Sequence, residues 1–203
     1  SFTTNFALGK VDTAAKTEEN VGMNFDYEIA LSTSFTGNDS LDVVMNAGTS
    51  ALFTELDMTN TSDARLELDT ISYTQSLSDR VTAFFASGNG TSGSALYNTA
   101  CVYGAQSDTF SDCGLSAANI DEGLGTATGV NFNFENGLSF SLGYEGQGMM
   151  SGETGLLAAG GADAFGGQIA YTGDSYGVSI SWANIDNHSN TNVRSNGATQ
   201  SVG

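Results

Sequence analysis

The sequence contains no proline, five lysine and arginine residues, one histidine and two cysteines among 203 residues. Because proline cannot donate a hydrogen bond to a sheet, its absence is typical of a chain made mostly of paired β-strands. Lysine and arginine are required to bind nucleic acid by counterion release and to bind anionic membrane surfaces. The net charge of -18 therefore excludes nucleic acid as a partner and favours cations instead.

Long hydrophobic runs are also missing. No segment has the roughly 18 consecutive apolar residues that a membrane-spanning helix needs. The chain begins with Ser1 and has no signal peptide, so we expect a processed chain or a fragment, which leaves export open. Hydrophobic residues make up 39% and charged residues only 14%, which excludes a charge-rich disordered chain.

The two cysteines, Cys101 and Cys113, lie in a segment rich in glycine, serine and aspartate. An even number of cysteines close together in a polar loop predicts a local disulfide and an oxidising compartment, with two free thiols as the alternative. Their spacing fits no zinc-binding pattern. Residues 88–123 as a whole show no periodicity, which predicts one long irregular loop.

One stretch, VGMNFDYEIALSTSF over residues 21–35, alternates apolar and polar side chains throughout. Since successive side chains of a strand point to opposite faces of a sheet, one face of this strand is apolar and the other is polar or small. An ordinary strand has about five or six residues, and this one is about twice as long. Either the strand crosses a thick layer, or the alternation is an accident of composition.

Similar alternation elsewhere predicts hairpins. Turn sequences separate the paired strands at residues 37–39, 78–80, 135–137 and 173–175, and longer connections lie between the hairpins. We count about nine strands, whereas closed single-chain barrels of bacteria have an even number. Either one strand is missed, or the chain is part of a longer barrel.

The segment RLELDTISYTQ, residues 65–75, changes phase within its length. Leu66 and Leu68 fall on one face, and Ile71 and Tyr73 then follow in the opposite phase. This change is compatible with a β-bulge, or with a strand that is buried on both faces near one end.

The polar faces of the expected strands contain Gly, Ser, Asn and Ala rather than many charged residues. A soluble β-sandwich would place charged side chains on a face that meets bulk water, whereas small uncharged ones suit the interior of a barrel. We therefore predict one all-β domain over residues 1–203, an antiparallel up-and-down transmembrane β-barrel of the outer-membrane type, complete or part of a larger barrel. A soluble sandwich or jelly roll is the alternative.

Aromatic side chains near the strand ends are typical of the girdles that membrane barrels place at both interfaces. They support the membrane interpretation of the apolar faces. The candidate membrane-facing residues are Val21, Phe25, Tyr27, Ile29, Phe140, Tyr144, Tyr176 and Trp182.

The segment FDYEIALSTSFTGNDSL, residues 25–41, resembles the opening barrel hairpin of cyanobacterial outer-membrane porins (OprB-like and iron-uptake porins). In that family a strand ending in TSFTG and an acidic turn precede the next strand. LELDTISYTQSLSDRVTAFFASG, FENGLSFSLGY and GGQIAYTGDSYGVSISWAN resemble later hairpins of the family. The resemblance covers about residues 21–184 and is most specific at Thr33 to Asp39. It implies an outer-membrane diffusion channel for inorganic ions and small solutes.

Polar-face residues of the expected strands are the ones that solutes in such a pore would meet. Carboxylates that line a water-filled pore favour cations over anions, so we predict weak cation selectivity. The candidate pore-lining residues are Asn24, Asp26, Glu28, Asp42 and Asn46.

Other chemistry has little support, and we do not expect an enzyme. The single histidine, His188, lies in an Asn-rich tail without the partners of a catalytic triad. No cofactor is predicted, although oxygen-rich loops at Asp39, Asp108, Asp112 and Asp186 are weak candidates for Ca²⁺. Because no calcium motif organises them, solvated acidic loops are the favoured interpretation.

Two alternative functions stay open. Long alternating strands with unpaired edges could pair between subunits, which would make the chain a secreted, self-assembling surface or filament protein stabilised by calcium. A soluble carbohydrate-active domain is the third class. The leading prediction places the chain in the cell outer membrane, in contact with lipid, small solutes and cations and able to form a homo-oligomer. The alternatives place it at the cell surface or outside the cell.

Overall fold

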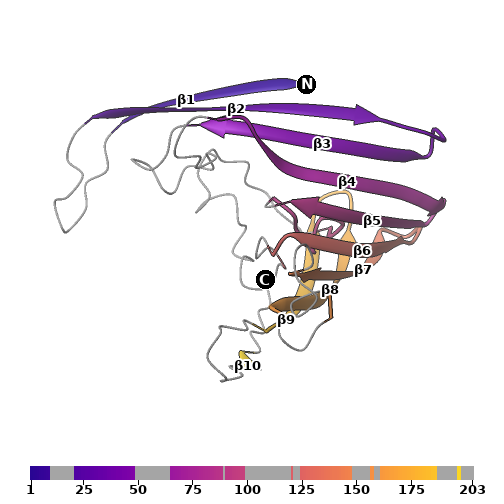
Figure 1. The fold of residues 1–203 in the computed structure, drawn as a ribbon. Coiled ribbons are helices and arrows are strands. Elements are labelled where there is room, and N and C mark those ends of the chain that lie inside the picture. Colours follow the sequence, from indigo (N-terminus) through magenta and orange to yellow (C-terminus); the bar gives the residue numbers. More distant parts are fainter. Residues whose placement is uncertain are drawn as a thin grey trace.

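The computed structural model describes residues 1–9, 21–48, 65–88, 90–98, 120, 124–147, 156–157, 161–186 and 196–197. These residues form a single antiparallel sheet in which every strand is hydrogen-bonded to its neighbours in the sequence (Figure 1). The strands are β1 (Phe2–Gly9), β2 (Gly22–Thr33), β3 (Asp39–Gly48), β4 (Glu67–Ser78), β5 (Val81–Gly88), β6 (Thr126–Asn133), β7 (Leu138–Gly146), β8 (Asp163–Thr172), β9 (Gly177–Asp186) and β10 (Asn196–Gly197).

The predicted all-β class and antiparallel order are confirmed. Nine strands have eight to twelve residues, as the sequence predicts, and β10 adds two more residues at the edge. Residues 90–98 and 120, which belong to the predicted irregular loop, contain no strand. Among the described residues, there is no helix of the length and hydrophobicity needed to span a membrane.

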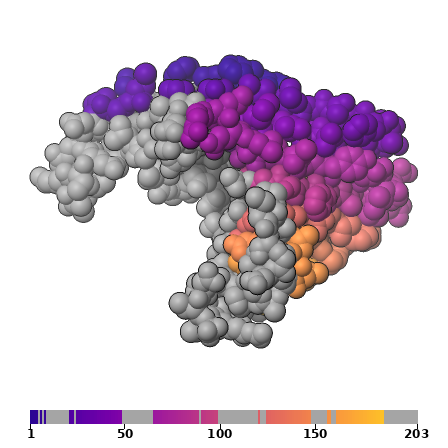
Figure 2. All heavy atoms as spheres, viewed as in Figure 1, coloured from indigo at the N-terminus to yellow at the C-terminus, as the bar shows by residue number. Residues whose placement is uncertain are grey.

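The sheet is strongly curved but open. Figure 1 shows it bending from β1–β3 through β5–β7 to β8 and β9, and the space-filling view shows these strands as one curved wall (Figure 2). In the described part of the chain, β1 pairs only with β2 and β10 only with β9, so these two edges do not meet. The closure that a barrel requires is therefore not seen within these strands.

Short and long connections lie at opposite ends of the strands. Residues 34–38, 79–80, 134–137 and 173–176 connect strand pairs at one end, which we call the turn end. Residues 10–21, 49–66, 89–125, 147–162 and 187–195 connect the remaining five pairs at the other end, the loop end. All four predicted turns are confirmed. In the third of them Gly137 has a φ of 83°, a conformation that glycine adopts without strain.

The phase change in residues 65–75 is a β-bulge. The register of β3 and β4 shifts between Val44, which pairs with Thr70, and Met45, which pairs with Leu68, so that Asp69 is the extra residue. Because one extra residue reverses the alternation, Leu68 and Ile71 lie on the same face despite their odd separation. Of the two interpretations that the sequence allowed, the bulge is correct.

The strand register divides the side chains between two faces of the sheet. The apolar face contains aromatic and aliphatic residues from β1 to β9, and the polar face contains small, polar and acidic residues. Cross-strand partners on the apolar face include Phe6↔Phe25, Leu31↔Val43, Phe132↔Phe140 and Ile169↔Ile180. Those on the polar face include Glu28↔Asn46, Asp42↔Ser72, Asn131↔Ser141 and Gln168↔Ser181.

Six of the buried apolar residues form two small clusters on the polar face. One contains Phe84, Ala86 and Ala127, against which Leu96 packs. The other contains Ile120, Ala164 and Ala183, with Ile185 at its border. Both clusters lie on the polar side of β5–β9, where residues 90–98 and 120 pack against the sheet.

Candidate functional site: the two faces of the sheet

The polar face of β2–β4, which we call the acidic half, contains the predicted pore-lining residues. Glu28 lies opposite Asn46, which lies opposite Glu67 on β4. Asp26 lies two residues before Glu28 on β2 and is opposite Gly48. Asp42, on β3, lies toward the turn end. The structure therefore places Asp26, Glu28, Asp42 and Asn46 on one face, as the alternation predicts, whereas the side chain of Asn24 lies outside the described residues.

Sequence reasoning missed Glu67. Counting in steps of two from Ile71 and Tyr73 puts residue 67 on the apolar face. The bulge at Asp69 reverses this phase, and Glu67 becomes an exposed carboxylate in the same row as Glu28. The signal was present in the sequence, because the apolar phase of Leu66 and Leu68 leaves the residue between them on the polar face.

Exposure differs among these carboxylates. Asp26 is only 8% exposed, whereas Glu28 and Asp42 are half-buried. Ser40 donates a hydrogen bond from its hydroxyl to Asp42 Oδ2 at 2.7 Å, and the hydroxyl groups of Ser40 and Ser32 lie 3.1 Å apart. Asp42 therefore belongs to a small hydroxyl and carboxylate network, whereas Asp26 belongs to none that we find among the described residues.

The polar face of β5–β9, which we call the packed half, differs in composition. Its side chains are mostly small and uncharged, and most are buried. Gln168 is nearly fully buried and donates to Ser181 Oγ at 2.9 Å. Glu145, the carboxylate of this half, is fully buried and accepts a hydrogen bond from the amide of Leu124 at 2.6 Å.

Residues 90–98 lie along the packed half. The segment starts at the loop end, where the Gly90 amide donates to the Asp69 carbonyl at 3.2 Å. In its middle, the Leu96 carbonyl accepts hydrogen bonds from Ser141 Oγ at 3.0 Å and from Asn131 Nδ2 at 3.2 Å. It reaches the turn end at Asn98, whose amide donates to Asn133 Oδ1 at 3.1 Å. This part of the long loop thus lies across the polar face.

Close packing of this segment depends on Gly143 of β7. A Cβ atom at Gly143 would lie 1.9 Å from the carbonyl oxygen of Gly93, so no larger residue fits without displacing the segment. Ile120 is fully buried beside it, and its carbonyl accepts from Ser92 Oγ at 3.0 Å and from the Ser94 amide at 3.2 Å. Burial of the Tyr97 side chain raises the pKa of its phenol, so this group is neutral.

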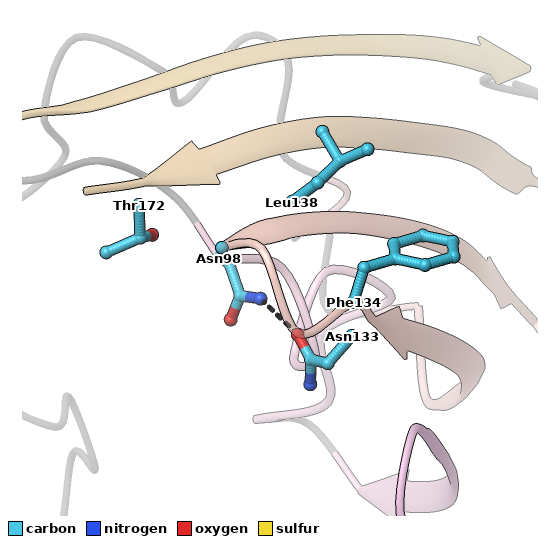
Figure 3. Close-up of a pocket in the computed structure, with 6 residues that line it drawn as sticks. Asn98, Asn133, Phe134, Leu138 and Thr172 are labelled. Carbon is cyan, nitrogen blue, oxygen red and sulfur yellow. Dashed lines mark hydrogen bonds between the residues drawn. The ribbon is translucent and has the colours of Figure 1, made fainter.

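A cavity of about 350 Å³ lies at the turn end. It is lined by uncharged residues, among them Asn98, Asn133, Phe134, Leu138 and Thr172. Figure 3 shows the amide groups of Asn98 and Asn133 turned toward each other and joined by their hydrogen bond. The cavity is therefore a neutral opening beside the end of residues 90–98, and none of its lining residues is an acid or a base.

Asp39 organises the turn between β2 and β3. Its Oδ1 accepts hydrogen bonds from Ser34 Oγ at 2.6 Å, from the Thr36 amide at 2.8 Å and from Thr36 Oγ1 at 2.8 Å. Its Oδ2 accepts from Tyr73 on β4 at 2.8 Å. The TSFTGND motif is therefore a turn built around one carboxylate, and the calcium candidate Asp39 uses its oxygens to accept hydrogen bonds from the protein.

Aromatic residues on the apolar face lie toward both strand ends. At the turn end, ring pairs form between Phe35 and Tyr73, between Phe132 and Phe140, and between Tyr171 and Tyr176. Toward the loop end, pairs form between Phe6 and Phe25 and between Phe165 and Trp182, and Phe2 pairs with Tyr27 on the first two strands. Aliphatic residues such as Leu31, Ile71, Leu142 and Ile169 lie between these groups.

The predicted membrane-facing residues fall on this face or directly beside it. Val21 precedes β2 and is 67% exposed, Tyr176 precedes β9 and is 64% exposed, and Trp182 is 40% exposed. Phe25, Tyr27, Ile29, Phe140 and Tyr144 are half-buried among their neighbours. The structure thus brings all eight to one side of the sheet.

The remaining sequence-based candidates lie outside the part of the chain that the structure describes. Cys101 and Cys113, Asp108 and Asp112, and His188 lie outside the described residues, as does the side chain of Asp186. Within the described ranges, no three Asp, Glu, His or Cys side chains come together in a group that could hold a metal ion.

Comparison of the chain with family models, with curated proteins and with solved structures gives no match. The function has to be inferred from the two faces themselves.

Proposed function

We propose that this chain forms an outer-membrane β-barrel, or a portion of one, that lets ions and small hydrophilic solutes diffuse passively with a weak preference for cations. The observation on which the proposal depends is the apolar face of nine neighbouring strands, which has aromatic residues toward both ends and aliphatic residues between them. This is the arrangement that a barrel presents to lipid.

The extent of exposed apolar surface supports lipid as its partner. Leu31 and Ile169 lie on strands far apart in the sheet, yet they are 54% and 55% exposed. A soluble monomer rarely exposes one continuous apolar surface of this size. Strands of ten residues, such as β3, β8 and β9, are about 33 Å long, and a tilt of about 40° reduces this to about 25 Å, the height of a barrel's apolar band.

The order of the connections supports the same topology. Outer-membrane barrels have short turns at one end and long loops at the other, and the described strands alternate between them without exception. The resemblance of residues 25–41 to the opening hairpin of cyanobacterial porins agrees with this assignment. Closure requires that the free edges of β1 and β9–β10 find partners, either in further strands of a longer chain or in another subunit.

The polar face supports a channel rather than a closed plug. Residues 90–98 lie over β5–β7 of its packed half and would narrow the lumen on that side. Its acidic half keeps Glu28, Asp42 and Glu67 at least partly exposed, and these carboxylates would meet passing solutes. Negative side chains along a water-filled path attract cations and repel anions, which supports weak cation selectivity.

A second candidate function is favoured by the open edges of the sheet. In the described part of the chain the outer edge of β1 has no strand partner, so it could add strands from another copy, as in a secreted self-assembling surface or filament protein. In that case the apolar face would be buried between sheets rather than in lipid. Aromatic residues at both ends of the apolar face have no special purpose in such an assembly, so we rank it second.

Folding into detergent and lipid tests the proposal. We expect the folded chain to migrate differently from the boiled chain on a denaturing gel and to give stepwise ion conductance in planar bilayers, with reversal potentials that favour K⁺ over Cl⁻. Filaments that sediment, fail to insert into lipid and dissolve when a chelator removes Ca²⁺ would instead support the second candidate and overturn the first.

A further inference from the structure

The carboxylate of Asp26 is in an unusual environment. Its residue is 8% exposed, and its Oδ1 neither reaches solvent nor accepts a hydrogen bond from any residue that the structure describes. A buried charged oxygen without compensation is costly, and carboxylates in such positions are paired or coordinate a cation. Asp26 also differs from Asp39 and Asp42, whose oxygens accept hydrogen bonds from hydroxyl groups.

The neighbours of Asp26 on the polar face provide further oxygen ligands. Glu28 follows two residues later on the same face, about 7 Å along the strand. Asn46 lies directly across from Glu28 on β3, at a side-chain separation of about 5 Å. Asp26 itself is paired with Gly48, which has no side chain, on β3 and with Asn5 on β1. Two carboxylates and one amide thus border the same small region.

We propose that Asp26, Glu28 and Asn46 form a weak binding site for a divalent cation such as Ca²⁺ or Mg²⁺. This inference rests on the proposed channel function, and it specifies which cations the pore would bind. Carboxylate and amide oxygens are the ligands that these hard cations prefer. The side-chain amide of Asn46 supplies the third ligand, since the described residues contain no group of three acidic side chains that could hold a metal ion.

The composition of the site predicts its strength. Ca²⁺ takes about six to eight oxygen ligands, so three protein side chains leave the other positions to water and backbone oxygens. We expect a dissociation constant of about 0.1–1 mM, the range of weak extracellular calcium sites. Weak binding suits a permeation path, since an ion must be held well enough to enter and loosely enough to leave.

Calorimetric titration of the folded protein in detergent with Ca²⁺ tests the site directly. We expect one ion to bind to the native sequence and the Asp26→Asn variant to lose at least about tenfold in affinity, because it lacks one of two charged ligands. Glu28→Gln should lose affinity as well, and it serves as the second variant if Asp26→Asn does not fold. Asp79→Asn removes the same charge from the turn between β4 and β5 and should change the affinity less than about twofold.

Several results would overturn the site. The first is the absence of Ca²⁺ binding up to about 10 mM by natively folded protein, ten times the weakest expected constant. Unchanged affinity in Asp26→Asn is the second. The third is an equal loss of Ca²⁺ affinity in Asp26→Asn and Asp42→Asn. Asp42 lies about 20 Å from Asp26 along the strand direction, so an equal loss would indicate that Ca²⁺ responds to the overall negative charge and not to a site at Asp26.

A bilayer measurement on the same preparations separates this inference from the proposed function. If the protein conducts ions but binds no Ca²⁺ at this position, the channel stands and the site is wrong. If the site binds Ca²⁺ with the predicted variant pattern but no conductance is found, the site stands and the channel is wrong. If both are correct, millimolar Ca²⁺ should lower the K⁺ conductance of the native channel and not that of Asp26→Asn.

Discussion

The acidic half and the packed half of the polar face belong to one continuous sheet, yet they are built differently. On β2–β4 the polar side chains include carboxylates, and Glu28, Asp42 and Glu67 stay at least partly exposed. On β5–β9 the side chains are mostly small and buried, and residues 90–98 lie over those of β5–β7. The apolar face shows no such division, because aromatic and aliphatic residues extend from β1 to β9. The apolar face therefore has one character along the whole sheet. The polar face, in contrast, is divided into a partly exposed acidic half and a buried packed half.

The largest expected effect tests whether the apolar face is equivalent in both halves. Leu31→Arg in β2 and Ile169→Arg in β8 should each destabilise the folded protein in lipid by about 2–4 kcal/mol, the cost of an arginine near the centre of a bilayer. Phe35→Arg at the turn end should cost about 0–1 kcal/mol, because it lies near the interface. Urea unfolding in lipid vesicles, followed by tryptophan fluorescence, measures all three.

Costs below about 0.5 kcal/mol for Leu31→Arg and Ile169→Arg would match ordinary water-exposed positions and contradict lipid contact. A large cost in only one of the two variants would restrict the membrane surface to that half of the sheet.

The second prediction tests the packed half by itself. Gly143→Ala should destabilise the protein by about 1–3 kcal/mol, since the added methyl group overlaps the Gly93 carbonyl oxygen and displaces residues 90–98. The same variant should increase single-channel conductance, because the segment would no longer narrow the lumen. Ser72→Thr adds one methyl group to the polar face of β4 and should change both quantities little. An unchanged unfolding midpoint and conductance in Gly143→Ala would mean that the segment does not occupy the lumen.

The smallest effect concerns the acidic half. Asp42→Asn should lower the K⁺ to Cl⁻ permeability ratio by about fourfold, since one charge at about 10 Å in water attracts K⁺ and repels Cl⁻ by about 0.4 kcal/mol each, which adds to about 0.8 kcal/mol for the ratio. Asp174→Asn, at the exposed turn between β8 and β9, should leave the ratio nearly unchanged. Reversal potentials in a KCl gradient measure this ratio. An equal effect of both variants would show that selectivity comes from the net charge of the chain and not from the acidic half.

Much of the sheet could be predicted because its signals are periodic. The alternation in residues 21–35, the turn at Asn136-Gly137 and the bulge between Leu68 and Ile71 all follow from the two-residue repeat of a strand and from turn chemistry. The same repeat placed four side chains on the polar face, those of Asp26, Glu28, Asp42 and Asn46. Local patterns therefore determined both strand positions and side-chain faces.

The covering of the packed half could not be predicted, for a physical reason. Residues 90–98 have no periodicity, and their position depends on hydrogen bonds to residues distant in the sequence, such as Asn131, Asn133 and Ser141. The close approach at Gly143 depends on the absence of a side chain, which a glycine-rich sequence does not mark as special. The burial of Asp26 was missed because strand periodicity assigns a face but not the depth of a residue on that face.

The central claim, that the apolar face contacts lipid, is tested most directly by the fluorescence of Trp182. It is the only tryptophan in the chain, it lies on the apolar face of β9 and it is 40% exposed. In lipid vesicles we predict blue-shifted emission that brominated lipids quench strongly and aqueous iodide quenches weakly. Strong quenching by iodide, together with no effect of brominated lipids on folded, vesicle-associated protein, would contradict the account.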